Sequence, residues 1–85
     1  MKISINHPLD TINFTGVNLA GYATIYFSYN TPIAFYAGGK KVIRENDWNV
    51  TTGKHLNWID SDKSIRIPGR DFEKQLDDLL KKLDS

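Results

Sequence analysis

The chain has 85 residues, of which 40% are hydrophobic and 25% are charged, and its formal net charge is +1. These values are ordinary for a folded protein and exclude a disordered, low-complexity chain. The absence of cysteine excludes a disulfide scaffold and a thiolate zinc site. No apolar run approaches the roughly 18 residues of a membrane span, so we expect a single soluble, cytoplasmic domain over residues 1–85 with no membrane contact.

The first half of the chain is rich in β-branched and aromatic residues, which predicts strands. We expect short strands at residues 3–6 and 11–15 and a clearer one at 24–29. Within the last stretch, Ile25, Phe27 and Tyr29 are expected to share one face of a sheet, with Tyr26 and Ser28 on the other.

Two turns are predicted after this strand. Residues 30–32 favour a turn or kink because Pro32 lacks the N–H that a central ladder needs. Gly38 and Gly39 favour a two-residue hairpin turn, in which both positions require positive φ. The register that this turn imposes pairs Ala34 with Ile43, Phe35 with Val42 and Tyr36 with Lys41.

The second half of the chain predicts two helices and a short strand. Residues 72–83 carry an apolar stripe at helical spacing, with charges elsewhere, as in a helix that packs on a sheet. The stripe consists of Phe72, Leu76, Leu79, Leu80 and Leu83. Residues 64–67 fit one further strand, and 51–59 fit a short helix with Thr51 or Thr52 as its N-cap.

These elements together predict an α+β fold. We expect a small antiparallel β-sheet of about four or five strands, with a short helix and a C-terminal amphipathic helix packed on one face. In the short helix, Leu56 and Ile59 should point into the core, and Trp58 should cover the sheet edge.

The short helix begins with a cluster of polar residues: Thr52, Lys54 and His55. A nucleotide phosphate loop is excluded, because Trp48 stands where the motif requires its first glycine and His55 where it requires serine or threonine. Two interpretations remain: helix capping alone, or capping combined with contact to a ligand at the helix N-terminus.

Metal and catalytic sites are less well supported. The two histidines, His7 and His55, lack metal-ligand spacing, so we expect neither a metal nor another cofactor. His55 could act as a general base, but no nucleophile with a known local signature accompanies it, so we expect no enzymatic activity. A small enzyme or small-ligand binder built on Thr52, Lys54 and His55 stays a third alternative.

The charge distribution raises a nucleic-acid alternative. Residues 40–70 carry seven basic and four acidic residues, whereas 71–85 carry three basic and five acidic ones. This asymmetry is well short of a basic stripe. The basic residues of the alternative are Lys40, Lys41, Arg44, Lys54, Lys63 and Arg66.

The segment 28–59 resembles a pattern found in small proteins of bacteriophages and prophages. In that pattern, Ser-Tyr-x-Thr-x-Ile/Val-Ala is followed by Trp-x-Val-Thr-Thr-x-Lys-His. The matching residues here are Ser28, Tyr29, Thr31, Ile33, Ala34, Trp48, Val50, Thr51, Thr52, Lys54 and His55. The resemblance implies a phage accessory protein with a recurrent polar cluster at Tyr29, Thr31, Thr52, Lys54 and His55.

We therefore expect a non-enzymatic binding module that acts in an infected bacterial host through a protein–protein interface. Its partner would be a host or phage protein, and antagonism of a host defence nuclease is one such role. The alternative is a nucleic-acid-binding domain that uses the basic 40–70 region. The predicted contact residues are Tyr29, Thr31, Lys41, Arg44, Thr52, Lys54 and His55. The sequence leaves the partner's identity and the oligomeric state open.

Overall fold

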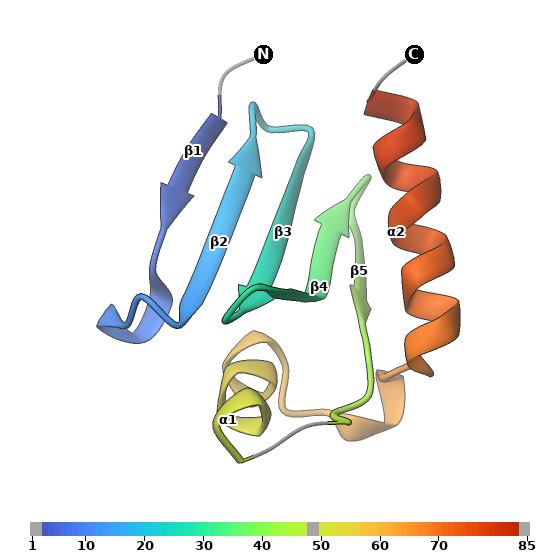
Figure 1. Cartoon of the computed structure of the whole chain (residues 1–85). Helices are drawn as coiled ribbons and strands as arrows, with labels where there is room; N and C mark the ends of the chain where they lie inside the picture. The colour runs from blue at the N-terminus through green and yellow to red at the C-terminus, as the bar shows by residue number, and fades with distance from the viewer. Residues whose placement is uncertain (1–2, 48–49, 84–85) are drawn as a thin grey trace.

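Over residues 3–47 and 50–83, which the computed structural model describes, the chain forms a five-stranded antiparallel sheet and two α-helices (Figure 1). The strands are β1 (Ile3–Asn6), β2 (Phe14–Leu19), β3 (Ala23–Ser28), β4 (Thr31–Ala37) and β5 (Lys40–Ile43). The helices are α1 (Val50–Ile59) and α2 (Gly69–Leu83), and the 3-10 turns are η1 (Pro8–Asp10) and η2 (Lys63–Ile65). Each strand pairs with its neighbour in sequence, which confirms the predicted α+β class.

The hairpin between β4 and β5 has the predicted turn and register. Gly38 and Gly39 adopt φ values of 58° and 75°, the left-handed region that favours glycine. The cross-strand partners are Ala34 with Ile43, Phe35 with Val42, and Tyr36 with Lys41. Because alternate residues face opposite sides, this register fixes which side chains meet each helix.

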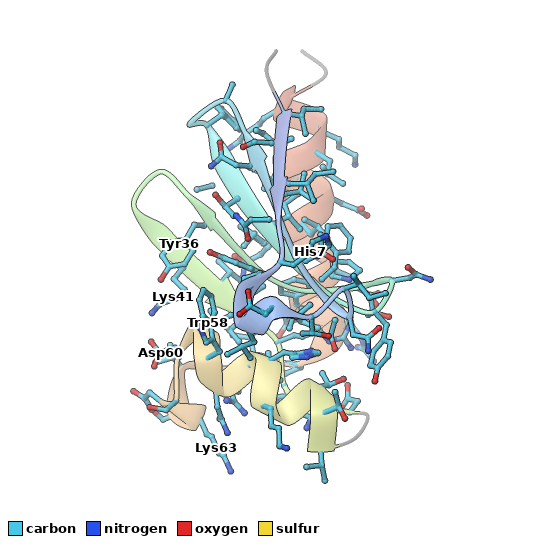
Figure 2. All side chains as sticks on the ribbon, turned by 90° about the vertical axis from the view of Figure 1, so that its left-hand side faces the viewer. His7, Tyr36, Lys41, Trp58, Asp60 and Lys63 are labelled. Carbon is cyan, nitrogen blue, oxygen red and sulfur yellow. The ribbon has the colours of Figure 1, made fainter. Side chains whose placement is uncertain are left out.

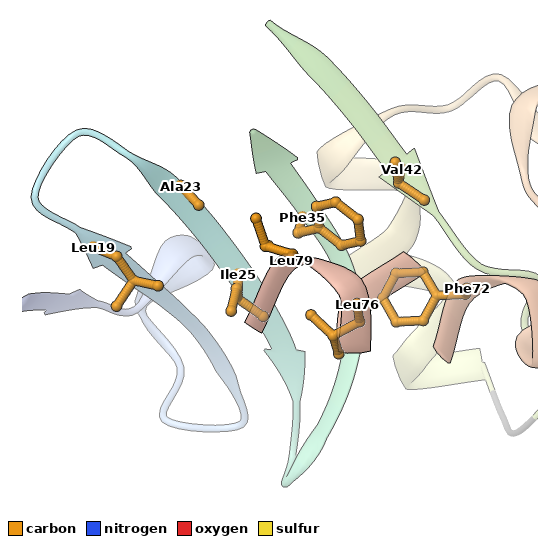
Figure 3. Packing of buried hydrophobic residues seen from close by; sticks show 8 residues of the cluster. All are labelled: Leu19, Ala23, Ile25, Phe35, Val42, Phe72, Leu76 and Leu79. Atoms are coloured by element: carbon orange, nitrogen blue, oxygen red, sulfur yellow. The ribbon is translucent and has the colours of Figure 1, made fainter. Parts of the chain in front are cut away.

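One face of the sheet is covered by α2 (Figure 3). Phe72, Leu76 and Leu79 of the helix are buried against the sheet. Their sheet partners in this core are Leu19, Ala23, Ile25, Phe35 and Val42.

The prediction that Leu80 is also a core residue is wrong, since its side chain is 41% exposed. An α-helix turns by about 100° per residue, so Leu80 lies about 100° from Leu79 and falls at the margin of the stripe. The side chain of Leu83 lies outside the described residues.

The opposite face is covered only in part. α1 closes one end of it, where Leu56 packs with Phe14, Ile33, Ala34 and Ile43. Ile59 and Tyr26 are partly buried against this second core. The predicted inward orientation of Leu56 is confirmed, and that of Ile59 is confirmed in part.

The predicted strand at 11–15 is largely wrong, because β2 runs from Phe14 to Leu19. This strand contains Gly16 and Asn18, two residue types that are depleted in strands. In the sheet, Gly16 lies between Asn6 on β1 and Tyr26 on β3, where an added Cβ would come within 2.8 Å of the Asn6 Oδ1 atom. Here the glycine permits close approach of side chains across the strand.

The predicted turn at 30–32 is shifted, because Thr31 and Pro32 already belong to β4. The tight turn is made one residue earlier by Tyr29, whose φ of 56° is left-handed. Proline is tolerated because the β3–β4 register shifts at this point: Phe27 faces Pro32, whereas Tyr26 faces Ala34. Such an irregularity lets a strand accommodate a residue that cannot donate to the ladder.

The predicted strand at 64–67 is replaced by η2 and a single bridge. The Asp62 side chain accepts hydrogen bonds from the backbone N–H and the hydroxyl of Ser64, which favours a turn over an extended strand. Ile67 alone pairs with the sheet, through a parallel bridge to Arg44.

Candidate functional site

The structure does not gather the seven predicted contact residues into one surface. Arg44, Thr52 and His55 are buried. The remaining four are exposed or half-buried: Tyr29, Thr31, Lys41 and Lys54. The three buried residues contact the interior of the protein and are not available to a partner at the surface.

Thr52 and His55 meet Ser28 in a buried polar cluster beneath α1. The Ser28 Oγ atom lies 2.7 Å from the His55 Nδ1 atom and 3.0 Å from the Thr52 Oγ1 atom. A serine hydroxyl has one proton, so Ser28 can donate to one of these partners and must accept from the other. Beneath this cluster, the His55 imidazole stacks on the Phe14 ring at 4.6 Å with an angle of 6° between the planes.

This arrangement overturns two predictions about the start of α1. Thr51 and Thr52 lie inside the helix, which begins at Val50, so neither is its N-cap. His55 is only 3% exposed and is therefore part of the core rather than of a contact surface. The sequence analysis did not identify Ser28 as a partner, because its place in a strand gives no local sign of a contact with a helix 24 residues away.

Ser28 and His55 are residue types that can act as a nucleophile and its base, but their burial here fits a role in holding the fold together. Both side chains are almost fully buried, which leaves the Ser28 hydroxyl no exposed position from which to attack a substrate. Burial also lowers the pKa of His55 below its usual 6.5, which favours the neutral ring. The cluster therefore fixes α1 on the sheet through satisfied hydrogen bonds.

Arg44 likewise has an internal role. Its guanidinium lies 3.2 Å from the Asp47 carboxylate and 3.5 Å from that of Glu73. It also lies 5.9 Å from the centre of the Phe72 ring, and a Cβ on Gly69 would collide with it. Arg44 thus ties the end of β5 to the first turn of α2, and Gly69 makes the room for it.

Lys41 is a predicted contact residue that lies beside an exposed aromatic ring. Its Nζ atom is 2.6 Å from the Asp60 Oδ2 atom and 5.6 Å from the centre of the Tyr36 ring. Hydrogen bonds to Asp60 and Tyr36 raise the pKa of Lys41, and the bond from Lys41 lowers the pKa of Asp60. The pair links β5 to the end of α1.

An aromatic cluster adjoins this ion pair. The Tyr26 ring packs edge-to-face with the rings of Tyr36 and Trp58, with 6.4 Å and 6.0 Å between the ring centres. Tyr36 is 39% exposed and Trp58 is 48% exposed, while Tyr26 lies between them and is half-buried. Figure 2 shows Tyr36, Lys41, Trp58 and Asp60 on the same side of the molecule. Trp58 therefore lies against Phe14 of β2 and Tyr26 of β3 rather than over the sheet edge as predicted, and it is half exposed.

Polar side chains continue this surface toward β2. The register places Asn18, Thr24, Tyr36 and Lys41 in one row across four strands. The Asn18 side-chain amide donates to the Thr24 hydroxyl at 2.9 Å. We call the surface formed by this row together with Tyr26, Trp58 and Asp60 the open face, because α1 ends beside it and α2 lies on the other side of the sheet.

Tyr29 and Lys54 lie near the start of α1. The Tyr29 ring, 48% exposed, lies 6.4 Å from the His55 imidazole. Lys54 is exposed on the helix, and Thr31 is half-buried at the start of β4. The polar cluster of the sequence pattern thus divides into a buried half that supports α1 and an exposed half that borders it.

The basic residues of the nucleic-acid alternative do not line a single groove. A cavity of about 380 Å³ contains two of them, Lys63 and Arg66, but Glu45 lines the same cavity. Arg66 already donates to the Asn57 side chain at 2.9 Å. The other residues that line this cavity are Asn46, Gly53 and Asn57. The local charge is mixed rather than uniformly positive.

No three histidine or carboxylate side chains within residues 3–47 and 50–83 come together in a way that could hold a metal ion. Among the same residues, no helix combines the length and apolar character needed to cross a membrane.

A family described as Family of unknown function (DUF8033) matches residues 5–74, which include all five strands in part or whole and the first turn of α2. No curated protein and no solved structure matches the chain.

Proposed function

This chain belongs to the Family of unknown function (DUF8033), and we propose that it is a non-enzymatic binding module that uses its open face to hold a protein partner. The observation that carries the proposal is the exposed cluster of Tyr36 and Trp58 around Tyr26. Tyrosine and tryptophan are enriched at protein interfaces, where a large rigid ring contributes contact area at low entropic cost.

The surroundings of the cluster support a protein partner over a nucleic acid. Asn18 and Thr24 offer amide and hydroxyl groups beside the rings, as in a polar rim. The nearest cation, Lys41, is already paired with Asp60. Nucleic-acid binding depends on phosphate neutralisation by several cations, whereas Lys41 and the neighbouring Arg66, which donates to the Asp60 carbonyl, are both engaged.

The biological setting belongs to the same proposal. The pattern shared with phage and prophage proteins, from Ser28 to His55, supports a phage accessory protein that acts in the cytoplasm of an infected host. Its partner would be a host or phage protein, and the role we propose is antagonism of a defence nuclease. Within this pattern, the buried residues Ser28, Thr52 and His55 support the sheet and α1, and so support the open face indirectly.

The test compares variants in host cells that carry a nuclease-based defence. Expression of the parent chain should restore phage plating, and the tagged chain should recover the nuclease from lysate. Tyr36→Ala combined with Trp58→Ala should abolish both effects while the far-UV circular dichroism is retained. Leu80→Ala is the control, since this large apolar side chain is 41% exposed on α2, on the other side of the sheet.

Equal recovery of a partner by the double variant and the Leu80→Ala control would reject the open face as the binding surface. The nucleic-acid alternative has a separate signature. DNA or RNA retention in a gel shift that collapses steeply with salt, and that Lys54→Ala and Lys63→Ala weaken, would replace the protein-partner proposal.

A further inference from the structure

The two edges of the sheet are treated differently by the chain. Beyond β5, the Ile67 N–H donates to the Ile43 carbonyl at 2.9 Å and the Glu45 N–H donates to the Ile67 carbonyl at 2.8 Å, so this edge is partly closed by the segment before α2. Beyond β1, no described residue pairs with the strand, which forms the outer edge in Figure 1. Such an edge presents a row of backbone donors and acceptors to another strand.

The side chains of β1 are unusual for an unpaired edge. Ile3 and Ile5 are 58% and 64% exposed, and their register opposite Leu19 and Val17 places them on the face that α2 covers elsewhere. Unpaired edges commonly carry charged residues or proline that prevent association, but Ile3–Asn6 contains neither. The free edge and the uncovered isoleucines therefore coincide on one strand.

We propose that β1 pairs with β1 of a second copy of this chain, which makes a symmetric dimer with one continuous sheet of ten strands. Antiparallel pairing about a two-fold axis at Ser4 places Ile3 opposite Ile5 of the partner, and Ile5 opposite its Ile3. A shift by one residue would bring the isoleucines to opposite faces of the joint sheet, so the apolar pattern selects this register. A two-fold interface is self-complementary, as this strand is.

The symmetry has a structural consequence for the open face. The two-fold axis runs perpendicular to the sheet, so both copies present the same face to the same side. Both α2 helices then lie behind the joint sheet, and both open faces lie in front. The dimer would offer two identical binding surfaces to a partner with repeated or paired sites.

Sedimentation equilibrium of the full chain tests the proposal. The parent should sediment with about twice the mass of a single chain, and Ile5→Lys should raise the dissociation constant about tenfold or more, because it places an ammonium group against an isoleucine. Ile5 is exposed in the single chain, so thermal melting of this variant should match the parent at protein concentrations below the parent's dissociation constant. Ile3→Glu combined with Ile5→Lys should restore the dimer, because the introduced carboxylate and ammonium groups face each other twice in this register.

Ser4→Cys gives an independent measurement in a chain without cysteine. Directly opposed antiparallel residues have Cα atoms about 4.5–5.5 Å apart, within the range that a disulfide spans. Mild oxidation should cross-link Ser4→Cys at least about tenfold faster than Ser61→Cys, an exposed serine in the loop after α1. A monomeric parent, a dimer indifferent to Ile5→Lys, failure of the double variant to restore association, or equal cross-linking of the two cysteine variants would each overturn the proposal.

Discussion

The two faces of the sheet are built from different chemistry. Against α2, the core consists of apolar residues, with Phe72, Leu76 and Leu79 packed on strand residues and the buried Arg44 at its margin beside Phe72. Against α1, apolar residues share the interior with the hydrogen-bonded cluster of Ser28, Thr52 and His55. Apolar packing is tolerant of detail, whereas a buried polar cluster must be satisfied in one geometry. The polar cluster on the second face therefore fixes the position of α1.

The largest expected effect tests the apolar face. Leu76→Ala should lower the free energy of unfolding by about 2–5 kcal/mol, the usual cost of emptying a buried leucine site, because Leu76 is 8% exposed. Leu80→Ala is the matched control on the same helix and should cost less than about 1 kcal/mol, since that leucine is 41% exposed. Urea denaturation measures both, and equal losses would mean that α2 is rotated from the packing described.

A smaller loss should follow from breaking the polar cluster. Ser28→Ala removes the hydroxyl that joins His55 to Thr52 and creates almost no cavity. Leaving buried groups without that partner should cost about 1–3 kcal/mol. Ser61→Ala, at an exposed serine, should change stability by less than about 0.5 kcal/mol. If Ser28→Ala were as silent as Ser61→Ala in urea denaturation, the two faces would not differ in kind.

The smallest expected effect is a gradual dependence of stability on pH, which comes from His55 and which apolar packing cannot produce. Burial lowers the pKa of His55 in the folded chain below 6.5, so the unfolded chain binds the proton at higher pH than the folded chain does. The stability that depends on neutral His55 is therefore fully present above pH 6.5 and is lost as pH falls from 6.5 through the folded pKa. In the parent, the urea concentration at the midpoint of unfolding should decrease as the pH is lowered across this window.

Two variants show which histidine causes the pH dependence. His55→Phe should remove it, because the replacement ring has no titratable nitrogen. His7→Gln should retain it, since His7 is exposed. A dependence that disappears with His7→Gln would place the titrating group outside the polar cluster.

Features that depend on neighbours in sequence were predictable. The Gly38–Gly39 turn and its register follow from local backbone requirements, and the stripe of α2 follows from helical spacing. Leu80 was misplaced because periodicity gives the centre of a stripe better than its margin. Pro32 was misread because the register shift that accommodates it arises from pairing with another strand.

The site was less predictable, for the same physical reason. The sequence pattern drew attention to Thr52 and His55, but their burial depends on contacts with Ser28 on a distant strand. Arg44 seemed a free cation until the fold placed Asp47 and Glu73 beside it. The open face could not be identified as a surface from the sequence, because its residues come from four strands and one helix. The cross-strand pairing of Tyr36 with Lys41 was its only predictable part.

The neighbour-to-neighbour order of the strands has a consequence for how the chain folds. Pairing between consecutive strands closes only short loops, so the sheet has low contact order and can form early. α2 is different, because it joins residues as far apart as Leu19 and Leu79. During synthesis, Ile25 and Phe35 must therefore remain uncovered until α2 has emerged from the ribosome, and this interval is when the nascent chain most needs protection from aggregation.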